Sequence, residues 1–151
     1  MSLQATSLEW LVKNAYDSNN WSQLDGKGNH AFAAAIMQDE MAVANELLAL
    51  NVFDVNQQNS DGNNCLWFAC FRENVPMIDA LIQAGVDINH QNTTGVTCLM
   101  YAASASKTAV VKALLVHGVD YCMKNQDDFT ALDFAGNIEI LRILKPLFGQ
   151  K

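Results

Sequence analysis

Proline is scarce in this chain, with two residues among 151, and only 17% of the residues are charged. The low proline count and the eight glycines exclude collagen-like and low-complexity sequences. Half of the residues are hydrophobic, which is typical of a compact globular domain and not of a disordered chain. The length fits a single domain.

Basic residues are also few, since 9 Lys and Arg stand against 16 Asp and Glu, for a net charge of -7. A surface of this sign repels phosphate groups, so we expect neither nucleic acid nor a membrane among the partners. No apolar stretch approaches the roughly 20 residues that a membrane-spanning helix needs. The first residues lack a positively charged segment followed by an apolar run, so we expect no signal peptide.

Cysteine is too sparse for the disulfide framework of a small secreted domain, since the chain has only four, at positions 65, 70, 98 and 122. We therefore expect reduced thiols and a cytoplasmic location. The histidines and cysteines never fall at His-x-x-x-His or Cys-x-x-Cys spacing, so we expect no metal and no cofactor. No catalytic set stands out, and the alternative is a small cysteine-dependent enzyme centred on Cys65, Cys70 or His90.

What the chain does contain is an internal repeat. Segment 59–91 aligns with segment 92–124 at an offset of 33. In an alignment of this length, ordinary composition would give roughly two identical positions by chance. Ten are found: Asn59/Asn92, Gly62/Gly95, Cys65/Cys98, Leu66/Leu99, Ala69/Ala102, Ala80/Ala113, Leu81/Leu114, Gly85/Gly118, Val86/Val119 and Asp87/Asp120. A fixed period of this length indicates stacked units, each of which buries its apolar face only against its neighbours.

The second unit shows the pattern within each repeat. Asp61-Gly62 is a turn dipeptide, and residues 66–72 form a short apolar run after it. Val75-Pro76 opens a second helix, whose apolar residues recur on one face as far as Gly85. Gly85 ends this helix because glycine readily adopts positive φ. We therefore predict a turn, a short helix, a second turn and a longer helix in every unit.

The string Gly95-Val96-Thr97-Cys98-Leu99-Met100-Tyr101-Ala102, with the string from Leu114 to Asp120, resembles ankyrin repeats. This resemblance implies a single-domain, all-α ankyrin-repeat solenoid, with a capping helix first and a truncated repeat last. The family's Thr-Pro-Leu-His motif lacks its Pro and His in every unit here. We therefore expect apolar packing to replace the hydrogen-bond network usually attributed to its Thr and His in the second and third units. The expected division is 1–24 for the N-terminal cap and 25–58, 59–91, 92–124 and 125–151 for the repeats.

Both ends of such a stack need covering residues. Thr6-Ser7-Leu8-Glu9 is a capping-box pattern and predicts a helix over 7–19, with a buried face formed by Leu8, Leu11, Val12, Ala15 and Tyr16. At the other end, an apolar helix interrupted at Pro146 is expected to pack on the third helix pair. Its start, near Asn137, comes about three residues early, which predicts that the preceding helix has lost most of a turn.

In the arrangement that the resemblance implies, hairpin loops and first helices line a concave face that binds a partner protein. Aromatic and Arg side chains are favoured interface anchors, so Phe71, Arg72 and Phe129 lead the candidates, with Trp67 beside them. Trp67 and Phe71 have an alternative role, which is to pack between helices or to cover a neighbouring unit. The full set of expected partner-binding residues is Asp61, Asn63, Trp67, Phe71, Arg72, Thr94, Val96, Ser104, Asp127 and Phe129.

The loop strings 56–60 and 89–94 are uncharged and rich in amides. Amide side chains both donate and accept hydrogen bonds, which suits an extended peptide, but stabilisation of local turns is an equal alternative. Asn56 and Asn89 resemble the asparagine that some ankyrin proteins present for hydroxylation. Asp127-Asp128 is interpreted as a turn that replaces Asp61-Gly62, and not as a pair of catalytic carboxylates.

These expectations favour a non-catalytic protein–protein interaction module, an adaptor that is monomeric and binds another protein through its concave face. A dedicated inhibitor or immunity-type protein is the alternative, because an acidic surface could occlude a basic partner enzyme. A fragment of a larger ankyrin protein is a further alternative. The identity of the partner stays open.

Overall fold

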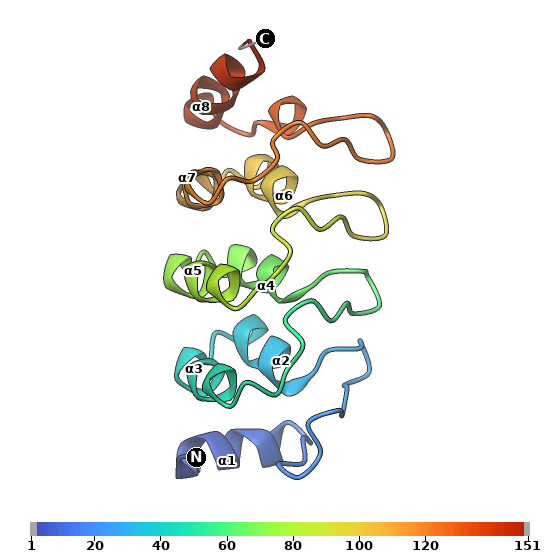
Figure 1. Ribbon diagram of the computed structural model, residues 1–151, viewed down its shortest axis with the longest axis vertical. Coiled ribbons are helices and arrows are strands. Elements are labelled where there is room, and N and C mark those ends of the chain that lie inside the picture. Colours follow the sequence, from blue (N-terminus) through green and yellow to red (C-terminus); the bar gives the residue numbers. More distant parts are fainter. Residues whose placement is uncertain (1–2, 150–151) are drawn as a thin grey trace.

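The computed structural model of the protein describes residues 3–149, and its helices stack in pairs along one long axis (Figure 1). Hairpin loops project from one side of the stack (Figure 1). Residues 3–149 contain helices and loops but no strand, which confirms the all-α solenoid. The elements are α1 (Ala5–Lys13), α2 (Ala31–Met37), α3 (Met41–Ala49), α4 (Cys65–Phe71), α5 (Val75–Gln83), α6 (Cys98–Ser104), α7 (Thr108–Val116), the 3-10 helix η1 (Leu132–Phe134) and α8 (Ile138–Phe148).

The helix pairs follow the period of the sequence. The inner helices α4 and α6, which lie nearer the hairpins, have seven residues each and begin 33 positions apart (Figure 1). The outer helices α5 and α7 have nine residues each and keep the same offset. Asn64 and Thr97 cap the inner helices, because each side-chain oxygen accepts a backbone N–H of the first turn.

Repeated small and aliphatic residues fill the interior. The inner helix of each unit contacts that of the next. Each of α2, α4 and α6 also carries a fully buried alanine at the equivalent position. The outer helices each contribute a fully buried leucine, and burying one leucine contributes about 1.5–3 kcal/mol. These two columns of equivalent residues are Ala35, Ala69 and Ala102, and Leu47, Leu81 and Leu114.

The capping helix differs from its prediction at both ends. α1 begins at Ala5 and ends at Lys13, so the predicted range of 7–19 was wrong. Gln4 precedes the helix, and no side chain caps it, so the capping-box prediction was also wrong. The chain leaves the helix at Ala15, where φ is 62°, and the Tyr16 backbone N–H then donates to the Leu11 carbonyl oxygen. This contact closes the helix end and returns Tyr16 to the core.

The buried face of α1 is also rotated from the expected one. Leu11 and Tyr16 are buried as predicted, but Val12 is 78% exposed, and Leu8 and Ala15 are exposed as well. Trp10 is buried instead: its Nε1 donates to Gln38 Oε1 at 3.0 Å, and its ring stacks on Tyr16 with 6.0 Å between ring centroids. The largest side chain of the helix therefore sets which face packs.

The last unit is shortened, as expected. Its first helix is reduced to η1, which has three residues where α4 and α6 have seven. The predicted interruption at Pro146 was wrong, because α8 continues through this residue to Phe148. Pro146 lies in the last turn, where its ring removes only one backbone N–H donor of the helix. Ile140 and Leu144 of α8 are fully buried, and α8 contacts α7.

A side-chain oxygen at one repeated position organises each hairpin. It accepts the backbone N–H groups two and four positions later, at 2.8–3.0 Å. The residues that supply it are Asp25, Asn59, Asn92 and Asn125. Each turn then places a residue at positive φ, namely Gly28, Gly62, Gly95 and Asp128. The value of 71° at Asp128 confirms that Asp127-Asp128 forms a turn.

Candidate partner-binding groove

A hollow of about 290 Å³ lies between the hairpins and the inner helices, and we call it the inner groove. Residues of the first three units form it, with polar side chains on the hairpins and mainly apolar side chains on the helices. A neighbouring hollow of about 420 Å³ shares Lys27, Asn29 and Met37, so the groove continues toward the N-terminal end. The inner groove is lined by Lys27, Asn29, Met37, Asn59, Asp61, Asn63, Trp67, Phe68, Phe71 and Tyr101.

The structure brings four of the predicted partner-binding residues together in this groove, namely Asp61, Asn63, Trp67 and Phe71. Phe71 is 40% exposed and Met37 is 38% exposed, although both are large apolar side chains. Trp67 packs against Tyr101 of α6 with 4.6 Å between ring centroids. Trp67 therefore packs between inner helices and also lines the groove, and its role in partner binding stays a prediction.

Cationic groups surround Phe71. The guanidinium carbon of Arg72 lies 5.3 Å from the Phe71 ring centroid, and Lys107 Nζ lies 5.7 Å from it, which favours the ring's position. Arg72 Nε donates to the Met37 carbonyl oxygen at 2.7 Å, so Arg72 links α4 to the end of α2. Lys107 Nζ donates to the Phe71 carbonyl oxygen at 3.1 Å and pairs with Glu73 at 3.6 Å.

The other predicted residues lie outside the inner groove. Thr94 Oγ1 donates to Asn92 Oδ1, and Ser104 Oγ donates to the Tyr101 carbonyl oxygen. Val96 is half-buried, and its backbone N–H donates to Asn92 Oδ1. Phe129 is exposed and packs edge-on against Phe134 at 5.9 Å. A partner would have to extend beyond the groove to reach these residues.

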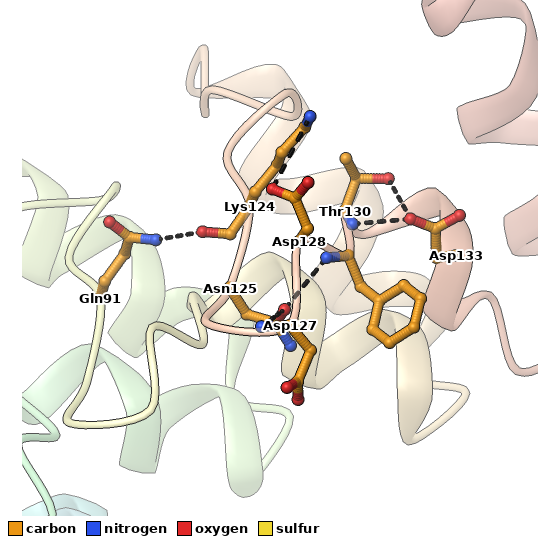
Figure 2. A network of polar contacts seen from close by, with 8 residues as sticks. Gln91, Lys124, Asn125, Asp127, Asp128, Thr130 and Asp133 are labelled. Atoms are coloured by element: carbon orange, nitrogen blue, oxygen red, sulfur yellow. Dashed lines mark hydrogen bonds and ion pairs between the residues drawn. The ribbon is translucent and has the colours of Figure 1, made fainter.

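The hairpin before η1 is held by the polar network of Figure 2. Gln91 Nε2 donates to the Lys124 carbonyl oxygen at 2.8 Å, which ties this hairpin to the previous unit. The Thr130 backbone N–H and hydroxyl donate to Asp133 Oδ2 at 2.8 and 3.2 Å. Figure 2 shows the Asp127 carboxylate pointing away from this network, so its charge remains available at the surface.

The amide-rich loops mostly hold neighbouring units together. Asn56 Oδ1 accepts the Asp87 backbone N–H at 2.7 Å, and Asn89 Oδ1 accepts that of Asp120 at the same distance. His90 Nε2 donates to the Gly62 carbonyl oxygen at 2.6 Å. These bonds support the structural interpretation of the loop amides, because Asn56 and Asn89 are already engaged within the chain.

The residues of the cysteine-enzyme alternative are not assembled into a site. Cys65, Cys70 and Cys98 are buried, and burial raises the pKa of the Cys65 thiol to about 12, so its thiolate is scarce at neutral pH. His30 Nε2 lies 3.9 Å from Cys65 Sγ, but it donates to the Asp54 carbonyl oxygen, while Nδ1 accepts the Ala33 N–H. Burial lowers the pKa of His30, which keeps the neutral ring that these two bonds require.

None of the helices in residues 3–149 is both long and apolar enough to cross a membrane. The same range holds no group of three or more His, Cys, Asp or Glu side chains that could bind a metal ion.

Stacked helix pairs, linked hairpins and a groove shared by successive units define a helical-repeat solenoid. A family model described as ankyrin repeats in three copies matches residues 3–92 and 73–150, so the chain belongs to the ankyrin-repeat family. Ankyrin repeats are generally protein–protein interaction modules, and the family is typically non-enzymatic. A comparison with curated protein sequences gave no match.

Proposed function

We propose that the chain is a non-catalytic module that binds another protein through the inner groove. The observation that carries this proposal is the exposure of Met37 and Phe71 at the helical end of the groove. Exposed apolar side chains in a hollow with a polar rim are typical of protein interaction sites. Trp67 and Tyr101 extend this apolar surface, and aromatic side chains are frequent interface anchors.

The test is the affinity of the Phe71→Ala variant for a partner captured from the native host. We expect binding to weaken at least about tenfold, or 1.4 kcal/mol, because Phe71 would be the apolar anchor. Phe71 alone is a sharper choice than Phe71 with Arg72, since Arg72→Ala also removes the bond from α4 to Met37. Val116→Ala is the matched control, because Val116 is a highly exposed apolar residue on the outer helix α7. Equal affinities of wild type and Phe71→Ala would contradict the proposal.

An inhibitor that occludes a basic partner is the second candidate. The net charge of -7 favours it, because long-range attraction speeds association with a positively charged protein. Raising the salt concentration should then slow association steeply. An association rate that does not change with salt would argue against this candidate and leave the general interaction role intact.

Other features remain proposals. The four cysteines form no disulfide, which supports the proposed cytoplasmic location because thiols stay reduced there. The division into a cap at 1–24 and repeats at 25–58, 59–91, 92–124 and 125–151 also remains a proposal. We also propose that the chain is a monomer and acts as an adaptor.

A further inference from the structure

The loop that leads from α3 to the second hairpin is one residue longer than its equivalents after α5 and α7 (Figure 1). A residue of positive φ and then a valine follow each outer helix, and the residues of positive φ are Asn51, Gly85 and Gly118. Val86 and Val119 are only 7% and 4% exposed, whereas Val52 is 49% exposed. Phe53, the extra residue, packs on the core with its ring 6.0 Å from that of Phe32. The insertion therefore leaves Val52 at the surface.

Two hollows of about 210 Å³ each adjoin at this insertion, because Phe53 and Asp54 line both. The first hollow is shared with the N-terminal cap and contains Leu24, which is 45% exposed. The second extends toward the second unit. No residue of either hollow lines the inner groove. We call this separate site the insertion surface, and its main residues are Trp21, Leu24, Leu48, Val52, Phe53 and Asp54.

The charge of the insertion surface has one sign. Asp54 is the only acidic or basic residue that lines the two hollows, and it forms no ion pair with another residue of 3–149. Residues 28–71 contain five acidic residues and no Lys or Arg. Residues 1–91 hold 3 basic and 11 acidic residues, for a net charge of -8, whereas residues 92–151 hold 6 and 5, for a net charge of +1. The negative charge of the protein is therefore concentrated in the half that carries this surface.

Two polar side chains of the insertion surface are already paired within the chain. Asn56 Nδ2 donates to the Gly85 carbonyl oxygen at 3.2 Å, and its Oδ1 accepts the Asp87 backbone N–H at 2.7 Å. Both ring nitrogens of His30 are bonded as well. These groups do not need a peptide backbone as a partner. An α-helix suits such a surface, because a helix pairs its own backbone groups and contacts its partner through side chains.

From these observations we infer that the insertion surface binds an amphipathic helix of a partner protein, with an apolar face and flanking Lys or Arg residues. This inference goes beyond the proposed function, because it concerns a second surface. The apolar face of the helix would cover Leu24 and Val52, which the chain alone leaves exposed. Lys or Arg at its edge would pair with Asp54, and their alkyl stems would add apolar contact. The surrounding negative charge attracts a basic helix and repels an acidic one.

The inference is tested with a displayed library of single helices of about eighteen residues, roughly 27 Å long, with randomised side chains. Helices selected on the wild-type chain are labelled, and their affinities are measured by fluorescence anisotropy. The enriched helices should share an apolar face flanked by Lys or Arg. Their affinity should fall as the salt concentration rises, because salt screens the attraction between the two charges.

A valine pair supplies the apolar readout. Val52→Ser should weaken binding of the selected helices at least about fivefold, because it removes an apolar contact at the centre of the surface. Val116→Ser is the matched control, since Val116 is 84% exposed on α7, outside both hollows. The control should leave affinity unchanged. Thermal unfolding of both variants checks that the fold is kept.

An aspartate pair supplies the electrostatic readout. Asp54→Asn should weaken binding about threefold and reduce its salt dependence, because it removes the charge of an exposed ion pair. It retains the side-chain oxygen that accepts the Asn56 backbone N–H. Asp120→Asn is the matched control, because Asp120 holds the same position in the third unit and accepts the Cys122 backbone N–H in the same way. This control should bind the helices as wild type does.

Three results would overturn the inference. One is a library without enriched helices, or with helices that bind Val52→Ser and Asp54→Asn as tightly as wild type. Another is a set of helices that require Phe71, since these would occupy the inner groove; this inference then fails and the proposed function stands. The third is self-association of the wild type that Val52→Ser abolishes, because a second copy would then cover the surface. If the captured partner does not need Phe71, the proposed function fails and this inference is judged by Val52 alone.

Discussion

The inner helices α4 and α6 and the 3-10 helix η1 of the last unit have related sequences but form different structures. Leu66 of α4 and Leu99 of α6 are almost completely buried, whereas Leu132, at the same position of η1, is only partly buried. The inner helices α4 and α6 each contact an inner element on both sides, whereas η1 contacts one inner helix, α6, besides the outer helix α8 of its own unit. In a stack, the number of neighbours decides how much a given residue contributes to stability.

The hairpin turns show the same difference. A Cβ atom on Gly62 would lie 2.7 Å from the Thr93 backbone nitrogen, and one on Gly95 would lie 3.0 Å from that of Gln126. Asp128 takes the same positive φ and carries a side chain, because no further hairpin stacks on it within the described residues. Glycine is therefore required where the next unit packs against the turn, and not by the turn alone.

The interior and the end of the stack should differ most in the free energy of unfolding that is lost when a leucine is replaced by alanine. Leu81→Ala should lower the free energy of unfolding by about 2–5 kcal/mol, because it opens a cavity between α5 and its neighbours. Leu141→Ala, on the partly exposed face of α8, should cost less than about 1 kcal/mol. Urea denaturation measures both values. Similar losses for the two variants would mean that the end of the stack is packed as tightly as its interior.

Alanine in the hairpin turns tests the second difference. Gly62→Ala should cost about 1–3 kcal/mol, because it combines positive φ with a close approach to Thr93. The reverse variant Asp128→Gly should change the free energy of unfolding by less than about 1 kcal/mol, since the turn already accepts a side chain there and the exposed ion pair with Lys124 contributes little. Thermal and urea unfolding measure the two variants. A gain at Asp128→Gly as large as the loss at Gly62→Ala would place the strain in the turn itself.

The smallest expected change in stability comes from a difference between the helix caps of the second and third units. Asn64 and Thr97 both cap inner helices, but Asn64 Nδ2 is buried without a hydrogen-bond partner in the described chain. Asn64→Thr should raise the free energy of unfolding by about 1 kcal/mol, because it removes the unpaired donor and retains a capping oxygen. Thr97→Asn is the reciprocal control and should lower it. A destabilised Asn64→Thr protein would show that the amide has a partner in solution.

Much of the fold could be predicted because the repeat makes each local signal appear several times. The helix order and the shortened last unit follow from residue spacing that each unit shows by itself. The limits of α1 were missed because they depend on Trp10, which bonds to Gln38 after the end of α2 and stacks on Tyr16. One helix outside the repeat also offers no second copy for comparison. Four of the ten predicted site residues line the groove and six do not. Whether a side chain reaches the groove depends on how neighbouring units stack, which a local sequence pattern does not give.

The sequence by itself determined the 33-residue period, the helix pairs and the glycine turns, because apolar spacing and turn residues act over a few positions. The tertiary structure decided which polar groups are already paired and which are free. The Asn56 and Asn89 amides are bound by loops about 30 residues away, whereas the Asn29 amide and the Tyr101 hydroxyl have no partner among residues 3–149. Hydrogen-bond pairing between units depends on how they stack, and no local pattern records it.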